Sequence, residues 1–478
     1  MKFIGTNKAI DDRLENLESH LREEHPALLA IVPTYRMFDK VLHNTGLLDP
    51  GESLAVHITW WPLISVLGTF SSGKSTFINH HLGQKLQNTG NQAVDDKFTV
   101  ICYGEDENNW VLPGTALDAD PRFPFFGMSK EIEKVSPGEG KRIDSYLQLK
   151  TTSSPVVKGC TLIDSPGFDA DDQRRTILRL TDHILDISDL VLVFFDARHP
   201  EPGAMQDTLQ HLVASTIRRS DSGKFMYVLN QIDTTAREDN PEEVIAAWQR
   251  ALSLAGLNSG RFFCIYNDEA AYPIDDKALR ERYQKKRDVD LDEIKKRVSE
   301  VGVERGYRII SALESSVIGL EQDVIPALKQ ALNRWQQMTL IGDGVALAAV
   351  IGLIIYSGTE RTMSIIDWIL AQPLGIIIAP LLMGAAAFGL HYWMRGLMAK
   401  ILARTLPERS GPLDLNMRTA FIKNTRIYRS IFRLNPVGWG SSSKRQLKEI
   451  REAIAGHVQV LNDTYTDPAG RGTDKKDT

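Results

Sequence analysis

Residues 63–76, LISVLGTFSSGKST, determine the fold that we expect for this chain. They hold the GxxxxGK[ST] pattern from Gly68 to Ser75, directly after an apolar run and before the probable helix of residues 75–82. Glycines allow a backbone to wrap around phosphates, and the amides at a helix N-terminus point at the negative charge. Lys74 is expected to reach the β- and γ-phosphates, and Ser75 to bind magnesium. The stretch therefore predicts a P-loop.

The sequence around this loop alternates short apolar runs with loops rich in glycine and aspartate, from residue 56 to about residue 275. Runs that are apolar on both faces suit a sheet covered by helices on both sides. The best candidates for strands are residues 63–67, 161–163, 190–195 and 225–229. The expected fold class is α/β: a P-loop domain with a mostly parallel, doubly wound sheet, joined to a helical-bundle stalk and a transmembrane helical hairpin.

A second motif bears on the choice between ATP and GTP. Asn230, Gln231 and Asp233 follow the fourth predicted strand and resemble the NKxD guanine motif, with glutamine in place of lysine. The carboxylate of Asp233 is suited to accept hydrogen bonds from the ring N–H and the exocyclic amine of guanine, which adenine does not offer in that arrangement. The motif predicts GTP as the ligand, and a plain turn at a strand end is the alternative.

Between these two motifs, TLIDSPGFD contains a DxxG element made by Asp164 and Gly167. We expect Asp164 to hold the magnesium shell through water and the Gly167 amide to meet the γ-phosphate. For the switch hydroxyl that caps magnesium we prefer Thr99 over Thr89, and an ordinary β-strand threonine is the alternative for Thr99. The stretch CIYNDEAA, residues 264–271, is a positional candidate for a further base contact.

Two apolar segments, residues 338–356 and 374–394, are each close to the roughly 20 residues that a helix needs to cross a bilayer. The second carries no charge and ends in aromatic and basic residues that suit a membrane interface. The first contains Asp343 about one helical turn from its start, where the carboxylate can stay near the headgroups. Two buried core helices are the alternative.

The segment from Arg395 to Arg433 contains nine Arg or Lys residues and two acids, whereas the whole chain has a net charge of −5. Basic residues next to a membrane segment favour the cytoplasmic side and attract anionic headgroups, so both chain ends are expected in the cytoplasm. A solvated basic helix is the alternative. We expect no nucleic-acid partner, because few aromatic residues are interleaved with these charges.

The spacing Leu447, Ile450, Ile454, Val458 and Leu461 predicts an amphipathic helix that needs a partner surface. The three cysteines lack metal-ligand or redox spacing, so a reducing compartment fits best. The N-terminus lacks an apolar run long enough for a signal peptide. The predicted division is an N-terminal helical segment (1–55), a GTPase domain (56–275), a helical stalk (276–336), the hairpin (337–394), and a basic segment with an amphipathic helix and polar tail (395–478).

The order of P-loop, switch threonine, DxxG and NQxD, with a long interval between Lys74 and Asp164, resembles the dynamin superfamily over residues 56–240. SYLQLKTTSSPVVKGCTLIDSPGFD is similar to the strand, proline and strand that lead into the DxxG of that superfamily. Outside this region the architecture resembles mitofusins and bacterial dynamin-like proteins. The resemblance implies GTP hydrolysis to GDP and phosphate, heads that dimerise or assemble further, and membrane fusion, fission or tethering.

The resemblance also implies roles for single residues. A serine in the dynamin P-loop holds a monovalent cation, K⁺ or Na⁺, and Ser71 stands at that place. Phe70 replaces the glutamine of the family, and Phe168 replaces the water-orienting glutamine of small GTPases. We therefore expect slow basal turnover, stimulated by contact between heads. Arg174 and Arg175 lie where a switch presents an arginine finger.

The predicted site follows from these motifs and the resemblance. The GTP-binding residues are Gly68, Thr69, Ser71, Ser72, Gly73, Lys74, Ser75, Thr76, Asp164, Gly167, Asn230, Gln231 and Asp233. The catalytic residues are Ser71, Lys74, Thr99 and Gly167. The Mg²⁺ ligands are Ser75, Thr99 and, through water, Asp164.

We expect a two-segment membrane protein, in the inner membrane if the source is bacterial. The leading hypothesis is a GTPase that remodels membranes. A membrane-tethered switch that recruits a partner is the alternative, and a soluble or ATP-using P-loop protein is a third.

Overall fold

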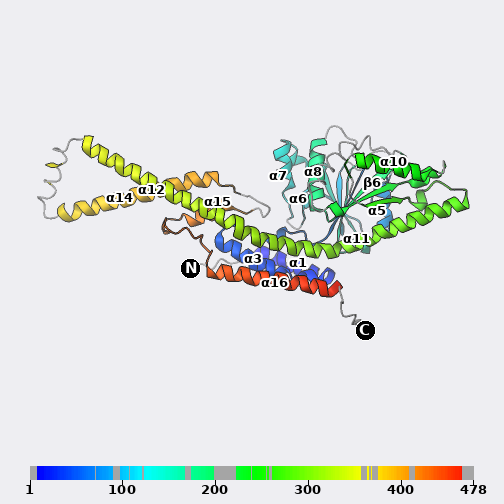
Figure 1. Ribbon diagram of the computed structural model, residues 1–478, viewed down its shortest axis with the longest axis horizontal. Coiled ribbons are helices and arrows are strands. Elements are labelled where there is room, and N and C mark those ends of the chain that lie inside the picture. Colours follow the sequence, from blue (N-terminus) through cyan, green and yellow to red (C-terminus); the bar gives the residue numbers. More distant parts are fainter. Residues whose placement is uncertain are drawn as a thin grey trace. The chain divides into compact units, whose positions relative to one another are not determined.

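The computed structural model describes residues 8–69, 71–89, 97–106, 108–120, 123–166, 174–198, 222–237, 240–254, 256–257, 261–356, 363–364, 368, 375–408 and 415–465. The chain forms two compact units, shown together in Figure 1. The head unit consists of Ser19–Leu28 and Val56–Ile309, and the helical unit of Met1–Glu18, Leu29–Ala55 and Ile310–Thr478. The predicted division into five segments stays a prediction.

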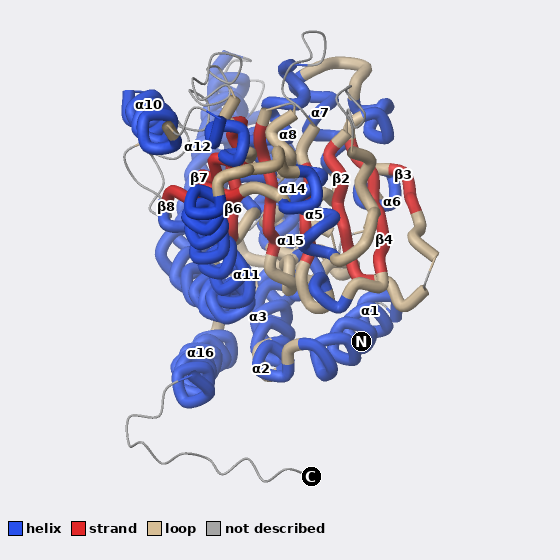
Figure 2. The backbone as a smooth tube through the Cα atoms, turned by 90° about the vertical axis from the view of Figure 1, so that its right-hand side faces the viewer, coloured by secondary structure: helices blue, strands red, loops and turns tan. Residues whose placement is uncertain are grey.

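The head unit is built on an eight-stranded sheet with the order β3-β4-β2-β5-β1-β6-β7-β8 (Figure 2). The strands are β1 (Leu63–Gly68), β2 (Phe98–Tyr103), β3 (Val111–Pro113), β4 (Leu147–Thr152), β5 (Thr161–Asp164), β6 (Leu190–Asp196), β7 (Phe225–Asn230) and β8 (Arg261–Ile265). Pairing is antiparallel for β2 with β5 and for β3 with β4, and parallel for the other described pairs. This confirms the predicted mostly parallel α/β sheet.

Both faces of the sheet are covered, because neighbouring residues of a strand point to opposite sides. On one face Ile64 and Val66 pack with Ile78 of α5 (Lys74–Leu82) and with residues of α11 (Lys277–Gly319). On the other face Leu63 packs with α8 (Arg174–Ile187), and Leu67 packs with α10 (Pro241–Leu254). The P-loop thus begins at the end of a central strand that is buried on both sides.

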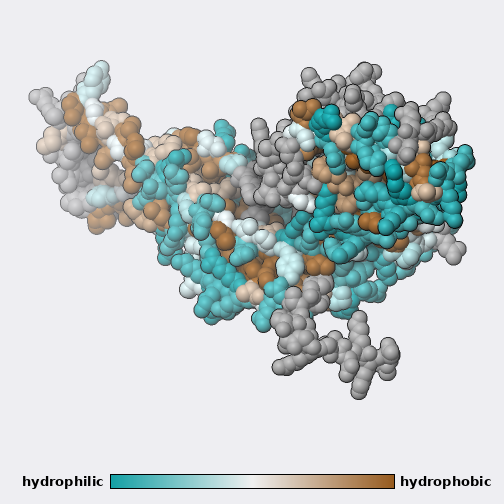
Figure 3. All heavy atoms as spheres, turned by 45° about the vertical axis from the view of Figure 1, so that its right-hand side comes forward, coloured by the Kyte–Doolittle hydropathy of each residue, from teal (hydrophilic) through white to brown (hydrophobic). Residues whose placement is uncertain are grey.

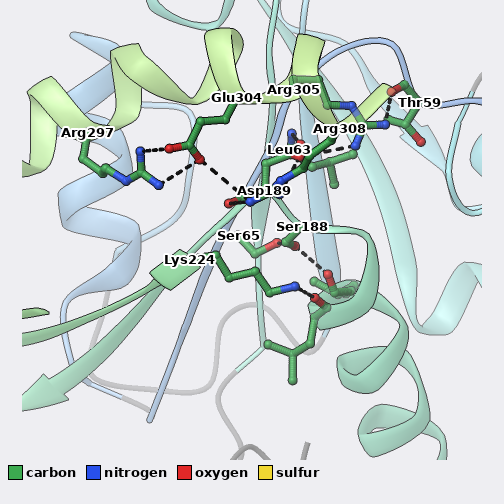
Figure 4. A network of polar contacts seen from close by, with 12 residues as sticks. Thr59, Leu63, Ser65, Ser188, Asp189, Lys224, Arg297, Glu304, Arg305 and Arg308 are labelled. Atoms are coloured by element: carbon green, nitrogen blue, oxygen red, sulfur yellow. Dashed lines mark hydrogen bonds and ion pairs between the residues drawn. The ribbon is translucent and has the colours of Figure 1, made fainter. Parts of the chain in front are cut away.

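Figure 4 shows how α11 is fixed to the start of β1 and β6 within the head unit. The Asp189 carboxylate is fully buried and accepts hydrogen bonds from the Leu63 backbone N–H (2.8 Å) and from the guanidinium groups of Arg308 (2.8 Å) and Arg305 (3.3 Å). Arg305 also donates to the Thr59 carbonyl. One carboxylate therefore holds a strand terminus and two arginines of one helix.

The helical unit joins the two ends of the chain. The α3 helix (Val32–Thr45) packs on α16 (Ser441–Tyr465), where the Thr34 hydroxyl lies 2.8 Å from His457 Nε2. Leu447, Ile450, Ile454 and Leu461 of α16 are buried and Val458 is half-buried, so the partner surface expected for this helix comes from the N-terminal helices. Helix α15 (Met417–Asn424) is fixed to the end of α3 by Lys423, which donates to the carbonyls of His43 and Asn44.

The remaining helices include a short π-helical turn between α11 and α12. Their bounds are α1 (Lys8–Glu24), α2 (Pro26–Leu29), α4 (Leu54–His57), α6 (Thr115–Asp118), α7 (Met128–Val135), η6 (Leu320–Val324), α12 (Ile325–Tyr356) and α14 (Gly375–Thr405).

Helices α12 and α14 contain the two predicted membrane segments. Both are long and apolar enough to cross a membrane by length and composition, and 11% and 0% of their most apolar stretches are buried. Figure 3 shows apolar side chains on the surface of this part of the helical unit. Leu353 is 72% exposed and Met383 is 73% exposed. The alternative of two buried core helices therefore does not describe these segments.

Polar contacts join α12 and α14 at one end of the apolar stretches. Asp343 Oδ2 lies 2.7 Å from His391 Nδ1, so the charged residue of the first segment has a partner on the second. The indole N–H of Trp335 donates to the Arg395 carbonyl (3.0 Å), and the Arg395 guanidinium lies 5.2 Å from the centre of the Trp335 rings. These contacts fix the register of the two helices.

Candidate nucleotide-binding site

The P-loop leaves the sheet at the end of β1, with β5 and β6 as the neighbouring strands. A Cβ atom on Gly68 would lie 2.6 Å from the carbonyl oxygen of Phe194 on β6, so only glycine fits there. Gly73 precedes α5 with a φ of +82°, in the left-handed region that favours glycine. Both glycines of the motif are thus required by the backbone path.

The described part of the loop is closed by its own side chains. Lys74 is 7% exposed, and its ammonium donates to the carbonyls of Gly68 and Thr69, each at 3.0 Å. The Ser72 hydroxyl donates to the Thr69 carbonyl at 2.7 Å. Ser75 and Thr76 lie in the first turn of α5 and are half-buried. A lysine and a helix N-terminus at one loop make a site suited to a polyphosphate.

Residues at the end of β7 form hydrogen bonds with the backbone of the P-loop. Asn230 donates through Nδ2 to the Ser72 carbonyl (2.8 Å), and Gln231 donates through Nε2 to the Ser71 carbonyl (2.6 Å). Ser71 and Gln231 both have positive φ, at 61° and 65°, which is uncommon for residues other than glycine. A hydrogen bond joins these two strained positions, so the segment after β7 and the P-loop contact each other directly.

Asp233 lies in the turn after β7 and is 4% exposed. Its Oδ2 accepts a hydrogen bond from the Tyr272 backbone N–H at 2.8 Å, so the loop after β8 contacts the turn that holds Asp233. That loop includes the stretch predicted as a further base contact, in which Asn267 accepts from the Glu269 N–H. Burial raises the pKa of the Asp233 carboxyl above its usual value, and the hydrogen bond from Tyr272 opposes this shift.

Asp164 ends β5 and is 3% exposed, with Gln87 Nε2 donating to its Oδ2 at 2.6 Å. A buried carboxylate and the hydroxyl of Ser75 are hard oxygen donors, which Mg²⁺ prefers, and Mg²⁺ sites usually complete their shell with substrate phosphates and water. No group of three or more His, Cys, Asp or Glu residues suited to a metal occurs among the described residues. The residues at hand fit Mg²⁺.

Thr99 lies in β2, directly opposite Asp164 in the antiparallel pair, and is fully buried. Its hydroxyl accepts a hydrogen bond from Gln148 of β4 at 2.7 Å. This placement favours the alternative, a strand threonine with a structural hydrogen bond, so the capping role stays a prediction. Thr89 is exposed in the loop after α5.

Several predicted positions lie outside the described residues: Phe70, Gly167 and Phe168, together with the side chains of Arg174 and Arg175.

Two groups of residues in the site were not predicted from the sequence. Arg198 follows β6, donates to both carboxylate oxygens of Asp196 and reaches the Ser71 carbonyl at 3.4 Å. The polar sequence at the end of a buried strand next to β1 was the signal available for this pair. Gln87 and Lys150 come from a loop and from a strand that is not adjacent to β5, and no local pattern marks them.

Comparison with known proteins agrees with this geometry. Residues 64–232 match the family model described as the Dynamin family. The matched region contains the P-loop, Asp164 and Asn230, and it ends one residue before Asp233. This match confirms the resemblance of the core of the head unit to the dynamin superfamily.

Curated relatives match 36% of the chain. EH domain-containing protein 2 of Arabidopsis thaliana is 28% identical over 180 residues, which cover 36% of this chain and 30% of the relative. EH domain-containing protein 1 of Homo sapiens is 25% identical over 179 residues, covering 36% of this chain and 31% of the relative. The match therefore spans less than a third of the length of these relatives.

Among solved structures, an oligomerised bacterial dynamin pair is 14% identical with a TM-score of 0.35, covering 94% of this chain and 79% of that one. LeoA, a bacterial dynamin GTPase from ETEC, is 12% identical with a TM-score of 0.32, covering 93% of this chain and 88% of that one.

Proposed function

We propose that this chain is a membrane-anchored dynamin-like GTPase that couples GTP binding and hydrolysis to head dimerisation and membrane remodelling by fusion, fission or tethering. The observation that carries the proposal is the pair of bonds from Asn230 and Gln231 to the P-loop carbonyls of Ser72 and Ser71, in a chain that also exposes two long apolar helices. The first feature supports a guanine nucleotide site, and the second supports an anchor in the bilayer.

In the proposed nucleotide site, different residues contact the phosphates, the base and the metal. When GTP binds, the Lys74 ammonium leaves the carbonyls of Gly68 and Thr69 and donates to oxygens of the β- and γ-phosphates. The backbone amides at the start of α5 donate to phosphate oxygens as well. Asp233 accepts from the guanine edge. Mg²⁺, held by Ser75 and through water by Asp164, supplies charge compensation for the phosphates when bound. Ser71, Thr99 and Gly167 complete the proposed catalytic set, with K⁺ or Na⁺ at Ser71.

The membrane contact of the proposal includes the basic segment after α14. Arg395 donates to the carbonyls of Arg426 and Arg429 and so fixes the following loop near the end of the hairpin. Tyr428 is 77% exposed and Phe432 is 68% exposed in that loop. An arginine-rich loop that exposes two aromatic side chains suits an interface with anionic headgroups. The proposal places the head and both chain ends in the cytoplasm.

GTP-dependent self-association of the full chain, measured with and without vesicles that contain phosphatidylserine, tests this proposal. We expect GTP to promote assembly of the heads, to a greater extent on vesicles, and we expect Lys74→Ala to remove the response. Carbonate washing should leave the wild-type protein in the vesicles. Assembly that responds equally to ATP, or complete release by carbonate, would support the soluble or ATP-using alternative.

A further inference from the structure

A buried bridge of side chains connects Lys150 of β4 to Asp164 of β5 through Gln87. The Lys150 ammonium donates to Gln87 Oε1 (2.5 Å), and Gln87 Nε2 donates to Asp164 Oδ2 (2.6 Å). Lys150 is 6% exposed, Gln87 is 1% exposed and Asp164 is 3% exposed. An ammonium only donates and a carboxylate only accepts, so these partners determine which way the amide of Gln87 faces.

The backbone of Gln87 is held by the P-loop helix. Asn79 of α5 accepts through Oδ1 from the N–H groups of Leu86 (2.9 Å) and Gln87 (2.8 Å). It also donates through Nδ2 to the Gln87 carbonyl (2.8 Å). Helix α5 begins at Lys74, so the position of Gln87 is tied to the element that meets the phosphates.

Charge explains why the amide is strongly oriented. The carbonyl end of Gln87 faces a buried cation and its N–H end faces a buried anion, so both hydrogen bonds are charge-assisted and polarise the amide in the same sense. Burying two charges costs more free energy than burying apolar side chains of the same volume. Stability therefore gives little reason for this bridge, whereas orientation of the carboxylate gives one.

We propose that Gln87 is a positioning residue for Asp164, with Lys150 fixing the orientation of its amide. By holding Oδ2, Gln87 sets the plane of the carboxylate and thus the direction in which Asp164 meets the water shell of Mg²⁺. The inference rests on the proposed function of Asp164. It links α5, which contacts the phosphates, to the carboxylate at the metal.

The test is the rate at which the full chain releases a fluorescent GTP analogue, measured against the concentration of free Mg²⁺. For Gln87→Met we expect the Mg²⁺ concentration that gives half-maximal retention to rise roughly tenfold, as for other residues that orient metal-site ligands. Charge alone predicts the opposite sign, since a carboxylate that loses a donor attracts Mg²⁺ more strongly. The direction of the shift therefore identifies a positioning role.

Gln84→Met is the matched control, because Gln84 lies in the same loop and its described hydrogen bond goes to Thr152 of β4. It should retain the wild-type Mg²⁺ dependence. Gln87→Met leaves the Lys150 ammonium buried without its acceptor, which can destabilise the fold. The double variant Gln87→Met/Lys150→Met removes this buried charge as well. A folded double variant should show the same shift.

Three outcomes distinguish the positioning role of Gln87 from the proposed role of Asp164. A shift in the two Gln87 variants and none in Gln84→Met supports the inference. Wild-type dependence in a folded Gln87 variant overturns it while the proposed function stands. Release from the wild type that does not depend on Mg²⁺ overturns the proposed role of Asp164, and the inference with it.

Discussion

In the proposed function, Asp233 carries the selectivity for guanine. The side chain is 4% exposed and its carboxylate already accepts from the Tyr272 N–H. Replacement by asparagine presents a donor where guanine also donates. We expect Asp233→Asn to weaken GTP binding about 100-fold or more and to shift preference toward xanthine nucleotides. Competition between GTP, XTP and ATP for a fluorescent analogue measures this, and unchanged GTP affinity would contradict the assignment.

Acidification should weaken GTP binding through the same residue. Only the ionised carboxylate accepts two N–H groups, and burial raises the pKa of Asp233 above the ordinary value of 3.8. Affinity should therefore fall as pH decreases through this raised pKa, earlier than for an exposed aspartate. A titration of Kd against pH should show this loss in the wild type. The Asp233→Asn profile, which retains the titration of the phosphates, should lack it.

Gly73 gives a steric test of the bond between the two motifs. A Cβ atom there would lie 2.3 Å from Asn230 Nδ2, on a backbone with positive φ. We expect Gly73→Ala to break the bond from Asn230 to Ser72 and to reduce GTP affinity at least tenfold. Gly83→Ala is a matched control for the left-handed backbone, since Gly83 has a φ of +67° and a Cβ atom there would meet no described atom within 4 Å.

At the scale of elements, the sequence predicted the central strands well and missed their last residues. The structure extends residues 63–67, 161–163, 190–195 and 225–229 by one residue each. The added residues are Gly68, Asp164, Asp196 and Asn230. An apolar pattern ends where a strand leaves the core, and the next residue is the one that a site uses. The end of the pattern thus marked the site.

Contacts between distant segments were not predictable in the same way. Lys150 of β4 is linked to Asp164 of β5 through Gln87, across the intervening strand β2, and that strand order is not encoded in any local period. The pairing of Asp343 with His391 likewise depends on the register of α12 and α14. The sequence places Asp343 and His391 as polar residues in two apolar segments, and it does not indicate that they contact each other.

The Asp189 network should contribute strongly to the stability of the head unit. Asp189→Ala leaves Arg305, Arg308 and the Leu63 N–H without their shared acceptor, at a cost of roughly 3 kcal/mol. Glu293→Ala is the control, because Glu293 also lies on α11 and its ion pair with Arg261 is exposed and worth less than about 1 kcal/mol. Calorimetry of the full chain should show a lower melting temperature for the first variant alone, and equal melting temperatures would contradict the role of the network.

On the scale of the whole molecule, one chain combines a head unit that resembles the Dynamin family with a pair of exposed apolar helices. The most direct test of the proposed coupling between GTP hydrolysis and membrane remodelling is an assay of lipid mixing and tubulation. The full chain is reconstituted in vesicles that contain phosphatidylserine. We predict that GTP produces these changes, that GDP does not, and that Lys74→Ala abolishes them while the protein stays in the membrane. GTP turnover by reconstituted protein without tethering, lipid mixing or tubulation would contradict the account and leave a membrane-tethered switch.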